Sequence, residues 1–285
     1  MADIRSIDAG TITETVRDIC LDANYVAGQD IRRAYDLALE REISPLGQQV
    51  LEQIIENVSV AEEDRVPMCQ DTGTVVVFAE VGQDVHITNG WFEDAINQGV
   101  SEAYRVGYLR KSMVSGPFTN RTNTRDNTPA IIHTRIVPGR QIELSILAKG
   151  GGAENMSRQA MLTPADGRQG IKEFVLETVE IAGPNACPPV IVGLGIGGTF
   201  DSVSRLAKHA LLRELGSPNP DQDAAHLEDE LIQEINQLGI GPHGFGGRIT
   251  ALAVHIESLP CHIASLPVAV NLQCGPAARH RTVTI

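Results

Sequence analysis

The residues that could do chemistry gather first in one short stretch, Val66 to Thr74, which reads VPMCQDTGT. It places a thiol, a carboxamide, a carboxylate and a hydroxyl on four consecutive residues, Cys69 to Thr72. Such a run suits neither a buried core nor a solvent-facing helix, so it favours a turn in which several side chains converge on one small object. A polar loop that carries one buried cysteine fits this stretch alone equally well.

Two further cysteines share this setting. Cys187 lies in the sequence GPNACPP and Cys274 in NLQCGP, so each is bounded by proline or glycine and lies close to polar residues. Only folding can bring either of them near Cys69. Three thiolates are too few to close a [4Fe–4S] cluster, which takes four. The iron left open would be a Lewis acid able to bind a hydroxyl and a carboxylate together. A buried cysteine in a turn remains the alternative for Cys187.

The two other cysteines are expected to be structural. Cys20 lies on an apolar helix face, and Cys261 precedes His262. An odd total of five cysteines, with no CxxC pair, argues against a disulfide framework and against an ordinary zinc finger.

Two stretches could bind an anion. Residues 110–129 form a twenty-residue, mostly polar loop with four cations, and arginine can hold a carboxylate with two parallel hydrogen bonds. A solvated loop is the alternative. The run Lys149 to Gly152 follows an expected strand, and its three glycines would let backbone N–H groups approach an anion closely.

A third glycine-rich stretch matches a nucleotide-binding pattern. Gly193, Gly195 and Gly198 fit GxGxxG, but a proline-containing linker and another helix follow, so the match lacks a clear βαβ unit. We therefore expect no dinucleotide site here. These glycines are expected to pack close to something bulky near Cys187.

Composition sets the class of protein. The 285 residues suffice for one large domain or two modest ones, and 42% hydrophobic but only 4% aromatic residues predict a mostly aliphatic core. The net charge of −13 and the absence of a basic stripe argue against nucleic acid and anionic membranes as partners. There is no apolar run long enough to span a membrane and the first residues do not resemble a signal peptide, so we expect a soluble, cytoplasmic protein.

Hydrophobic periodicity predicts an α+β fold: an N-terminal helical part and a mixed or antiparallel sheet with flanking helices. We expect one domain over residues 1–285, with residues 1–65 as its helical part. Helices are expected within 11–63, 91–109, 163–182, 200–215 and 221–238, and strands at 74–81, 130–137, 141–148, 250–258 and 264–272.

Several motifs occur together in a recognisable order. Residues 67–73 read PMCQDTG, 149–155 KGGGAEN, 183–188 GPNACP, 193–199 GLGIGGT and 271–274 NLQC. With them the sequence resembles the class I, iron–sulfur fumarate hydratases and L-tartrate dehydratases. The resemblance covers nearly the whole chain and is to their alpha subunit, which is the N-terminal domain of the one-chain enzymes.

The resemblance implies a site in which three cysteines hold a [4Fe–4S] cluster with one open iron. It implies further residues around a dicarboxylate substrate: a proton donor to the leaving hydroxyl, a histidine that orients the substrate, and three substrate-binding positions. The cluster ligands would be Cys69, Cys187 and Cys274, the catalytic residues Asp71 and His262, and the substrate-binding residues Gln70, Arg110 and Gly151.

The implied reaction is the reversible hydration of fumarate to (S)-malate. The alternative in the same class is L(+)-tartrate dehydration to oxaloacetate. Two alternatives from other classes are a non-catalytic iron–sulfur redox or sensing module and an anion-binding protein without catalysis. The one-chain relatives continue into a second domain that supplies the base, whereas this sequence ends soon after Cys274. We therefore expect a beta subunit to complete the active site in a hetero-oligomer.

Overall fold

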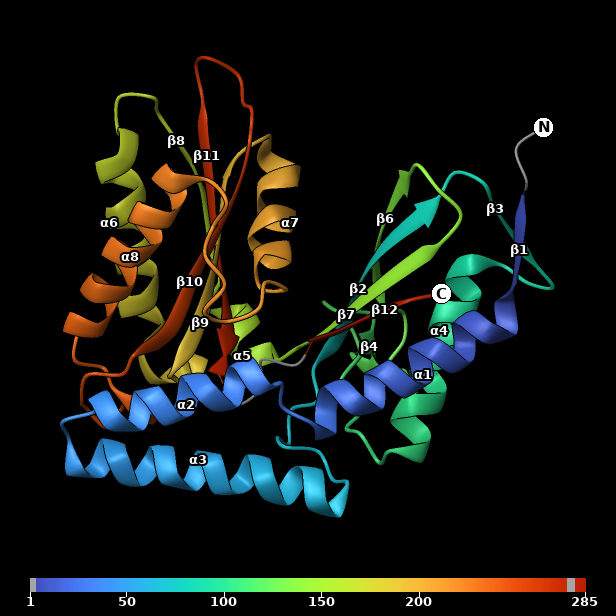
Figure 1. Cartoon of the computed structure of the whole chain (residues 1–285), viewed down its shortest axis with the longest axis horizontal. Coiled ribbons are helices and arrows are strands. Elements are labelled where there is room, and N and C mark those ends of the chain that lie inside the picture. Colours follow the sequence, from blue (N-terminus) through green and yellow to red (C-terminus); the bar gives the residue numbers. More distant parts are fainter. Residues whose placement is uncertain (1–3, 276–279) are drawn as a thin grey trace. The chain divides into compact units, whose positions relative to one another are not determined.

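The computed structural model of the chain describes residues 4–275 and 280–285, which divide into two compact units (Figure 1). The first unit consists of residues 4–27, 58–150 and 280–285, and the second of residues 28–57 and 151–275. Each unit is built on a mixed four-stranded sheet with helices. The predicted α+β class is confirmed. The expectation of a single domain over residues 1–285 stays a prediction.

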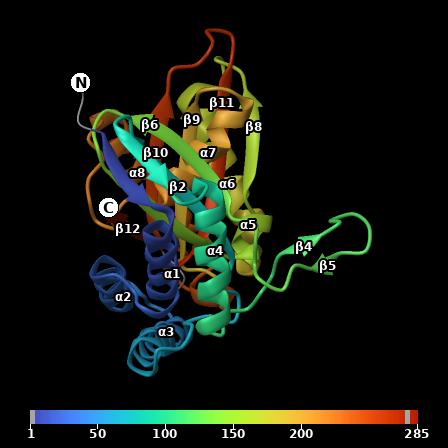
Figure 2. The ribbon, with the colours of Figure 1, turned by 90° about the vertical axis from the view of Figure 1, so that its right-hand side faces the viewer.

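The first unit centres on a sheet with the strand order β12–β7–β2–β6. Strand β7 pairs antiparallel with both β12 and β2, and β2 pairs parallel with β6. Two small pairs lie outside this sheet, parallel β1–β3 and the antiparallel hairpin β4–β5, which Figure 2 shows projecting from the rest of the unit. The elements are β1 (Arg5–Asp8), α1 (Ala9–Tyr25), β2 (Thr74–Gly82), β3 (Val85–Thr88), α4 (Phe92–Val106), β4 (Val114–Ser115), β5 (Thr122–Asn123), β6 (Ile131–Val137), β7 (Ile142–Lys149) and β12 (His280–Thr284).

One aliphatic core joins α1 and α4 to strands β2 and β7. The two helices pack closely because Gly99 of α4 has no side chain, and a Cβ there would lie 2.6 Å from the Thr13 carbonyl oxygen. Cys20 lies in this core at 1% exposure, which confirms its predicted place on a buried helix face. Among the helices of the described residues, none is both long and apolar enough to cross a membrane.

The second unit centres on a sheet with the strand order β10–β9–β11–β8. Strand β9 pairs parallel with β10 and antiparallel with β11, which also pairs antiparallel with β8. Helices α6 and α8 share the larger core with one face of this sheet, and α7 packs on the other face (Figure 1). The elements are α2 (Gln29–Arg41), α5 (Gly151–Asn155), β8 (Arg158–Leu162), α6 (Gly167–Ala182), η1 (Gly183–Ala186), β9 (Val190–Gly197), α7 (Phe200–Ala210), α8 (Gln222–Gln237), η2 (Pro242–Gly244), β10 (Ala251–Leu259) and β11 (Leu266–Cys274). Helix α3 (Pro45–Asp64) begins in this unit and ends in the first.

The glycines of β9 allow α7 to lie directly on the sheet. A Cβ at Gly193 would lie 2.0 Å from the Ala207 carbonyl oxygen, and one at Gly195 would lie 2.3 Å from that of Val203. The bulky object against these glycines is therefore the backbone of a helix. The interpretation that these glycines lack a clear βαβ unit was wrong. Strands β9 and β10 are parallel neighbours joined through α7 and α8, so the connection is a crossover that the proline-containing linker conceals.

A buried carboxylate anchors the second unit. Glu42, directly after α2, is 2% exposed. It accepts hydrogen bonds from the backbone N–H groups of Ile43, Ser44, Arg248 and Ile249 at 2.7 to 2.9 Å. Burial alone would raise the pKa of Glu42, but these backbone donors outweigh it and hold the pKa below its ordinary value of 4.5.

Glu42→Gln should therefore destabilise the chain at pH 7 by about 2–4 kcal/mol, because an amide cannot accept from all these buried donors. A group with a depressed native pKa stabilises fully above its unfolded pKa, and this stabilisation is lost as the pH falls through the native pKa. The difference between the two proteins should consequently shrink as the pH falls below 4.5. Urea denaturation at a series of pH values measures it, with exposed Glu40→Gln as the matched control. Equal stability of Glu42→Gln and wild type at pH 7 would contradict the anchoring role.

Candidate functional site

The Cys69 turn, residues 67–73, lies in the first unit just before β2. The Cys69 thiol is half-buried and lies 3.4 Å from the Gln70 side-chain oxygen. The Asp71 carboxylate accepts a hydrogen bond from the backbone N–H of Gly73 at 3.0 Å, which fixes its place within the turn. The turn thus presents a thiol, an amide and a carboxylate at the surface, as the residue types predict.

A buried tyrosine stabilises the turn by hydrogen bonding to its backbone. Tyr104 of α4 is fully buried, and its hydroxyl lies 2.6 Å from the Thr72 carbonyl oxygen and 3.0 Å from that of Gly73. Gly73 has a φ of +76°, and a Cβ there would lie 2.7 Å from backbone atoms of Lys149, so only glycine fits. The turn therefore rests on α4 and on the last residue of β7.

The long polar loop begins beside this turn. The Thr72 hydroxyl donates to the Arg110 carbonyl oxygen at 3.0 Å, which brings exposed Arg110 next to the residues around Asp71. Asn127, fully buried, ties the loop to the turn, because its amide donates to the Gly73 carbonyl at 3.1 Å and accepts from the Ser112 N–H at 2.8 Å. The fold thus brings Cys69, Gln70, Asp71 and Arg110 together in one unit.

In the second unit, Cys187 and Cys274 lie at the same end of the sheet. Cys187 follows η1, is exposed, and has a left-handed backbone with φ 54° and ψ 64°. Cys274 ends β11 and is the strand partner of Val190, the first residue of β9. The backbone N–H of Gly275 also bonds to the Pro189 carbonyl at 2.7 Å. Cys187, in a turn, and Cys274, at a strand end, therefore lie at the same end of this sheet, and their joint binding of a cluster stays a prediction.

Gly151 lies near the same end, because it begins α5, which packs on η1. A Cβ on the next residue, Gly152, would lie 3.1 Å from the Asn185 carbonyl oxygen. His262 lies elsewhere in this unit, in the loop that joins the end of β10 to the start of β11. Strand β11 separates it from Cys274 by about 26 Å along the strand. The structure thus places Gly151, but not His262, near the two cysteines of this unit.

The thiols differ in their fitness to bind metal. All five cysteines are thiols, and none forms a disulfide. Burial raises the pKa of Cys20 far above its ordinary value, which rules out an accessible thiolate there. Cys261 is exposed rather than buried, and its thiol contacts the Ser265 carbonyl oxygen at 3.3 Å. Cys69, Cys187 and Cys274 are half-buried or exposed, so their donor chemistry fits a thiolate-bound cluster.

The structure divides these three candidate ligands. Cys69 belongs to the first unit, and Cys187 and Cys274 belong to the second, so neither unit alone contains the trio. Across the described residues, no group of three His, Cys, Asp or Glu side chains is arranged to hold a metal ion. The three-ligand set stays a prediction.

Two residues that stabilise the Cys69 turn were not predicted from the sequence. Tyr104 and Asn127 hold the turn, yet Tyr104 occupies an ordinary apolar helix position and Asn127 is one of several polar residues in a loop. The one available signal was that Tyr104 is among only four tyrosines, whose buried hydroxyls usually have partners.

Comparison with known proteins identifies the class. Residues 13–284 match the family model described as Fumarate hydratase (Fumerase). A relative named putative L(+)-tartrate dehydratase subunit alpha, from Methanocaldococcus jannaschii, is 43% identical over 268 residues, or 92% of this chain and 94% of the relative. The L(+)-tartrate dehydratase subunits alpha of Escherichia coli strain K12 and Shigella sonnei are each 34% identical over 239 residues, or 82% of this chain and 78% of theirs.

The chain therefore belongs to the fumarate hydratase and tartrate dehydratase family, and it is a hydro-lyase of that family. The resemblance to the alpha subunits of these enzymes is confirmed.

Two buried tyrosines give a matched stability test. Tyr104→Phe should destabilise the chain by about 1–2 kcal/mol, because the one hydroxyl hydrogen that reaches the buried Thr72 and Gly73 carbonyl groups is lost. Tyr35→Phe should be neutral or stabilising, because the Tyr35 hydroxyl is buried and has no hydrogen-bond partner among the described residues. Thermal and urea unfolding of the metal-free chain measures both. Equal destabilisation by the two substitutions would show that the hydroxyl bonds to Thr72 and Gly73 contribute nothing specific.

Proposed function

We propose that the chain is the alpha subunit of a two-chain L(+)-tartrate dehydratase, which removes water from tartrate to give oxaloacetate. The observation that carries the proposal is the 43% identity over 92% of this chain to a relative with that name. The Escherichia coli relatives named as the same subunit support it. This reverses the order of the sequence-based reading, which placed fumarate first.

Fumarate hydration to (S)-malate is the second candidate. It is favoured by the matching family model, whose description is fumarate hydratase. The two reactions make or break the same kind of C–O bond beside a carboxylate, and tartrate differs from malate by one hydroxyl. The same residues can therefore serve either substrate.

We propose that Cys69, Cys187 and Cys274 bind one [4Fe–4S] cluster. What supports this is their chemistry: three thiols outside the core, each in a sequence bounded by proline or glycine. The bound cluster would supply a Lewis acid for the hydroxyl and carboxylate of the substrate.

The Cys69 turn and the neighbouring Arg110 would bind the dicarboxylate and protonate its leaving hydroxyl. Arg110 can hold a carboxylate with two hydrogen bonds, and the Gln70 amide can add a third. Asp71, fixed by the Gly73 N–H, would protonate the departing hydroxyl.

In the second unit, the Gly151 backbone N–H would bind a substrate oxygen. His262, at the other end of β11 from Cys274, would orient the substrate.

A beta subunit would complete the site. The relatives named above are alpha subunits. Elimination of water also needs a base at the carbon-bound proton in addition to an acid at the hydroxyl, and we assign that base to the partner chain in a hetero-oligomer. The cytoplasmic location expected from the sequence stays a prediction.

Metal analysis tests the ligand set. Cys69→Ser, Cys187→Ser and Cys274→Ser should each abolish cluster loading, because each removes one of three thiolates. Cys20→Ser should load normally, and so should Cys261→Ser. Iron and sulfide content after anaerobic reconstitution measures the result. A fully loaded Cys187→Ser variant would overturn the three-thiol model.

An anaerobic assay tests the reaction. The loaded chain together with its partner should dehydrate L(+)-tartrate with a higher kcat/KM than it shows for malate or fumarate, and the loaded chain alone should be inactive on all three. Faster fumarate turnover would favour the second candidate. Activity of this chain alone would remove the need for a partner, and inactivity of the assembled enzyme on every substrate would favour a redox or sensing role.

A further inference from the structure

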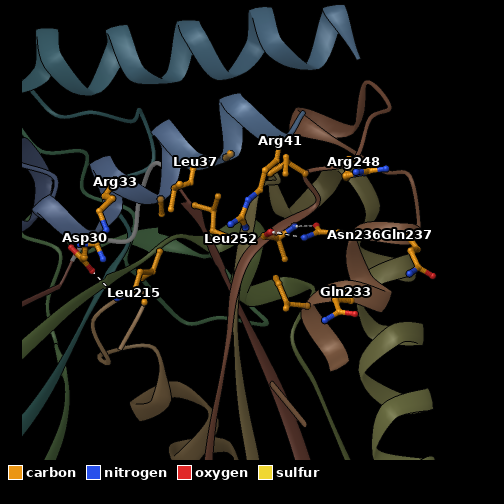
Figure 3. Close-up of a pocket in the computed structure, with 16 residues that line it drawn as sticks. Asp30, Arg33, Leu37, Arg41, Leu215, Gln233, Asn236, Gln237, Arg248 and Leu252 are labelled. Carbon is orange, nitrogen blue, oxygen red and sulfur yellow. Dashed lines mark hydrogen bonds between the residues drawn. The ribbon is translucent and has the colours of Figure 1, made fainter. Parts of the chain in front are cut away.

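A cleft of about 620 Å³ lies within the second unit, between α2, α8 and the start of β10 (Figure 3). It is separate from the cysteine-bearing turns, because none of its lining residues is a cysteine or belongs to the cysteine motifs. Its volume falls within the range of roughly 300–1,000 Å³ typical of small-molecule sites.

The cleft is cationic in an acidic protein. Three arginines and one aspartate line it, whereas the whole chain carries a net charge of −13. No carboxylate among the described residues forms an ion pair with Arg33, Arg41 or Arg248, although arginines elsewhere do form such pairs. The carboxylate of Asp30 accepts from the Leu215 backbone N–H at 3.0 Å and so has a structural bond of its own.

The arginines lie along one helix face and on the segment opposite. Arg33, Leu37 and Arg41 are four residues apart in turn on α2, which puts them on one side of the helix. Arg33 and Arg41 are separated by about 12 Å along the helix axis. Figure 3 shows Arg33 at one end of the cleft, Arg41 and Arg248 towards the other, and Leu37 between.

The walls are fixed rather than loosely placed. The carboxylate of Glu42 holds the backbone of Arg248 against the end of α2. Across the cleft, the Asn236 side chain accepts from the N–H groups of Thr250 and Ala251 at 2.8 and 2.9 Å, and this locks α8 to the start of β10. The side chains of Glu42 and Asn236 thus bond to backbone groups and not to the guanidinium groups that line the cleft.

We propose that this cleft binds an elongated organic anion with acid groups towards both ends and an apolar middle. Guanidinium groups match carboxylate and phosphate oxygens with paired hydrogen bonds. Leu37 and Leu252 supply an apolar surface between them, and Ile232 also lines the cleft. The site is independent of the proposed dehydratase reaction and does not require the cluster.

Calorimetric titration of the intact chain with three probes of equal length tests the charge requirement. Suberate has two carboxylates on an eight-carbon chain, octanoate has one, and 1,8-octanediol has none. Each carboxylate should improve the affinity about tenfold, since a charged hydrogen bond typically contributes this much or more. If the diol binds as tightly as suberate, the arginines do not select the ligand and the proposal fails.

Variants locate the binding. Arg33→Gln and Arg41→Gln should each weaken suberate binding about tenfold, and Leu37→Ala should weaken suberate and octanoate alike. Arg205→Gln removes an equal charge from α7, outside the cleft, and should leave binding unchanged. Unfolding temperatures confirm that each variant is folded. Unchanged suberate binding in both Arg33→Gln and Arg41→Gln would overturn the site. So would loss of binding in the complex with the partner subunit, because the cleft would then be a protein interface.

Discussion

The close approach of Gly73 to the backbone of Lys149 is the constraint on which the first unit depends. No side chain fits between the two segments, so the turn that carries Cys69, Gln70 and Asp71 lies directly against the end of β7. The hydroxyl of Tyr104 and the amide of Asn127 then occupy the carbonyl groups of that turn. The backbone of this segment is thereby fixed by packing and by hydrogen bonds to its carbonyl groups, while the Asp71 carboxylate is fixed by the Gly73 N–H.

The second unit achieves a similar result with strand register. Because Cys274 pairs with Val190, the end of β11 and the start of β9 meet, and the turn before β9 carries Cys187. Glycines on β9 let α7 lie on the sheet, while α6 and α8 share an aliphatic core with its other face. A slip of one residue in this antiparallel pairing would turn Cys274 to the opposite face of the sheet. The core that fixes the register therefore also fixes the thiol.

Local chemistry could be predicted from sequence here, but long-range placement could not. The Cys69 turn, the helices of residues 11–63 and the strands before and after His262 follow from adjacent residues and from periodicity. Strands β1, β3, β8 and β12 were missed because they are short and their pairing partners are distant in the sequence. The parallel pairing of β9 with β10 was missed for the same reason, since a linker hides the crossover. Tyr104 and Asn127 have ordinary local sequences. Their importance arises only because tertiary folding brings the carbonyl groups of the Cys69 turn against their side chains.

The edge strand β12 has a consequence for the order in which the chain matures. Residues 280–284 pair along β7, yet they are synthesised after every other element of both units. Until they emerge from the ribosome, the outer edge of β7 exposes unpaired backbone groups of the kind that associate with other strands. The unit that carries Cys69 therefore completes its sheet only after the whole of the second unit has been translated. The edge of β7 consequently stays unpaired throughout the synthesis of the second unit.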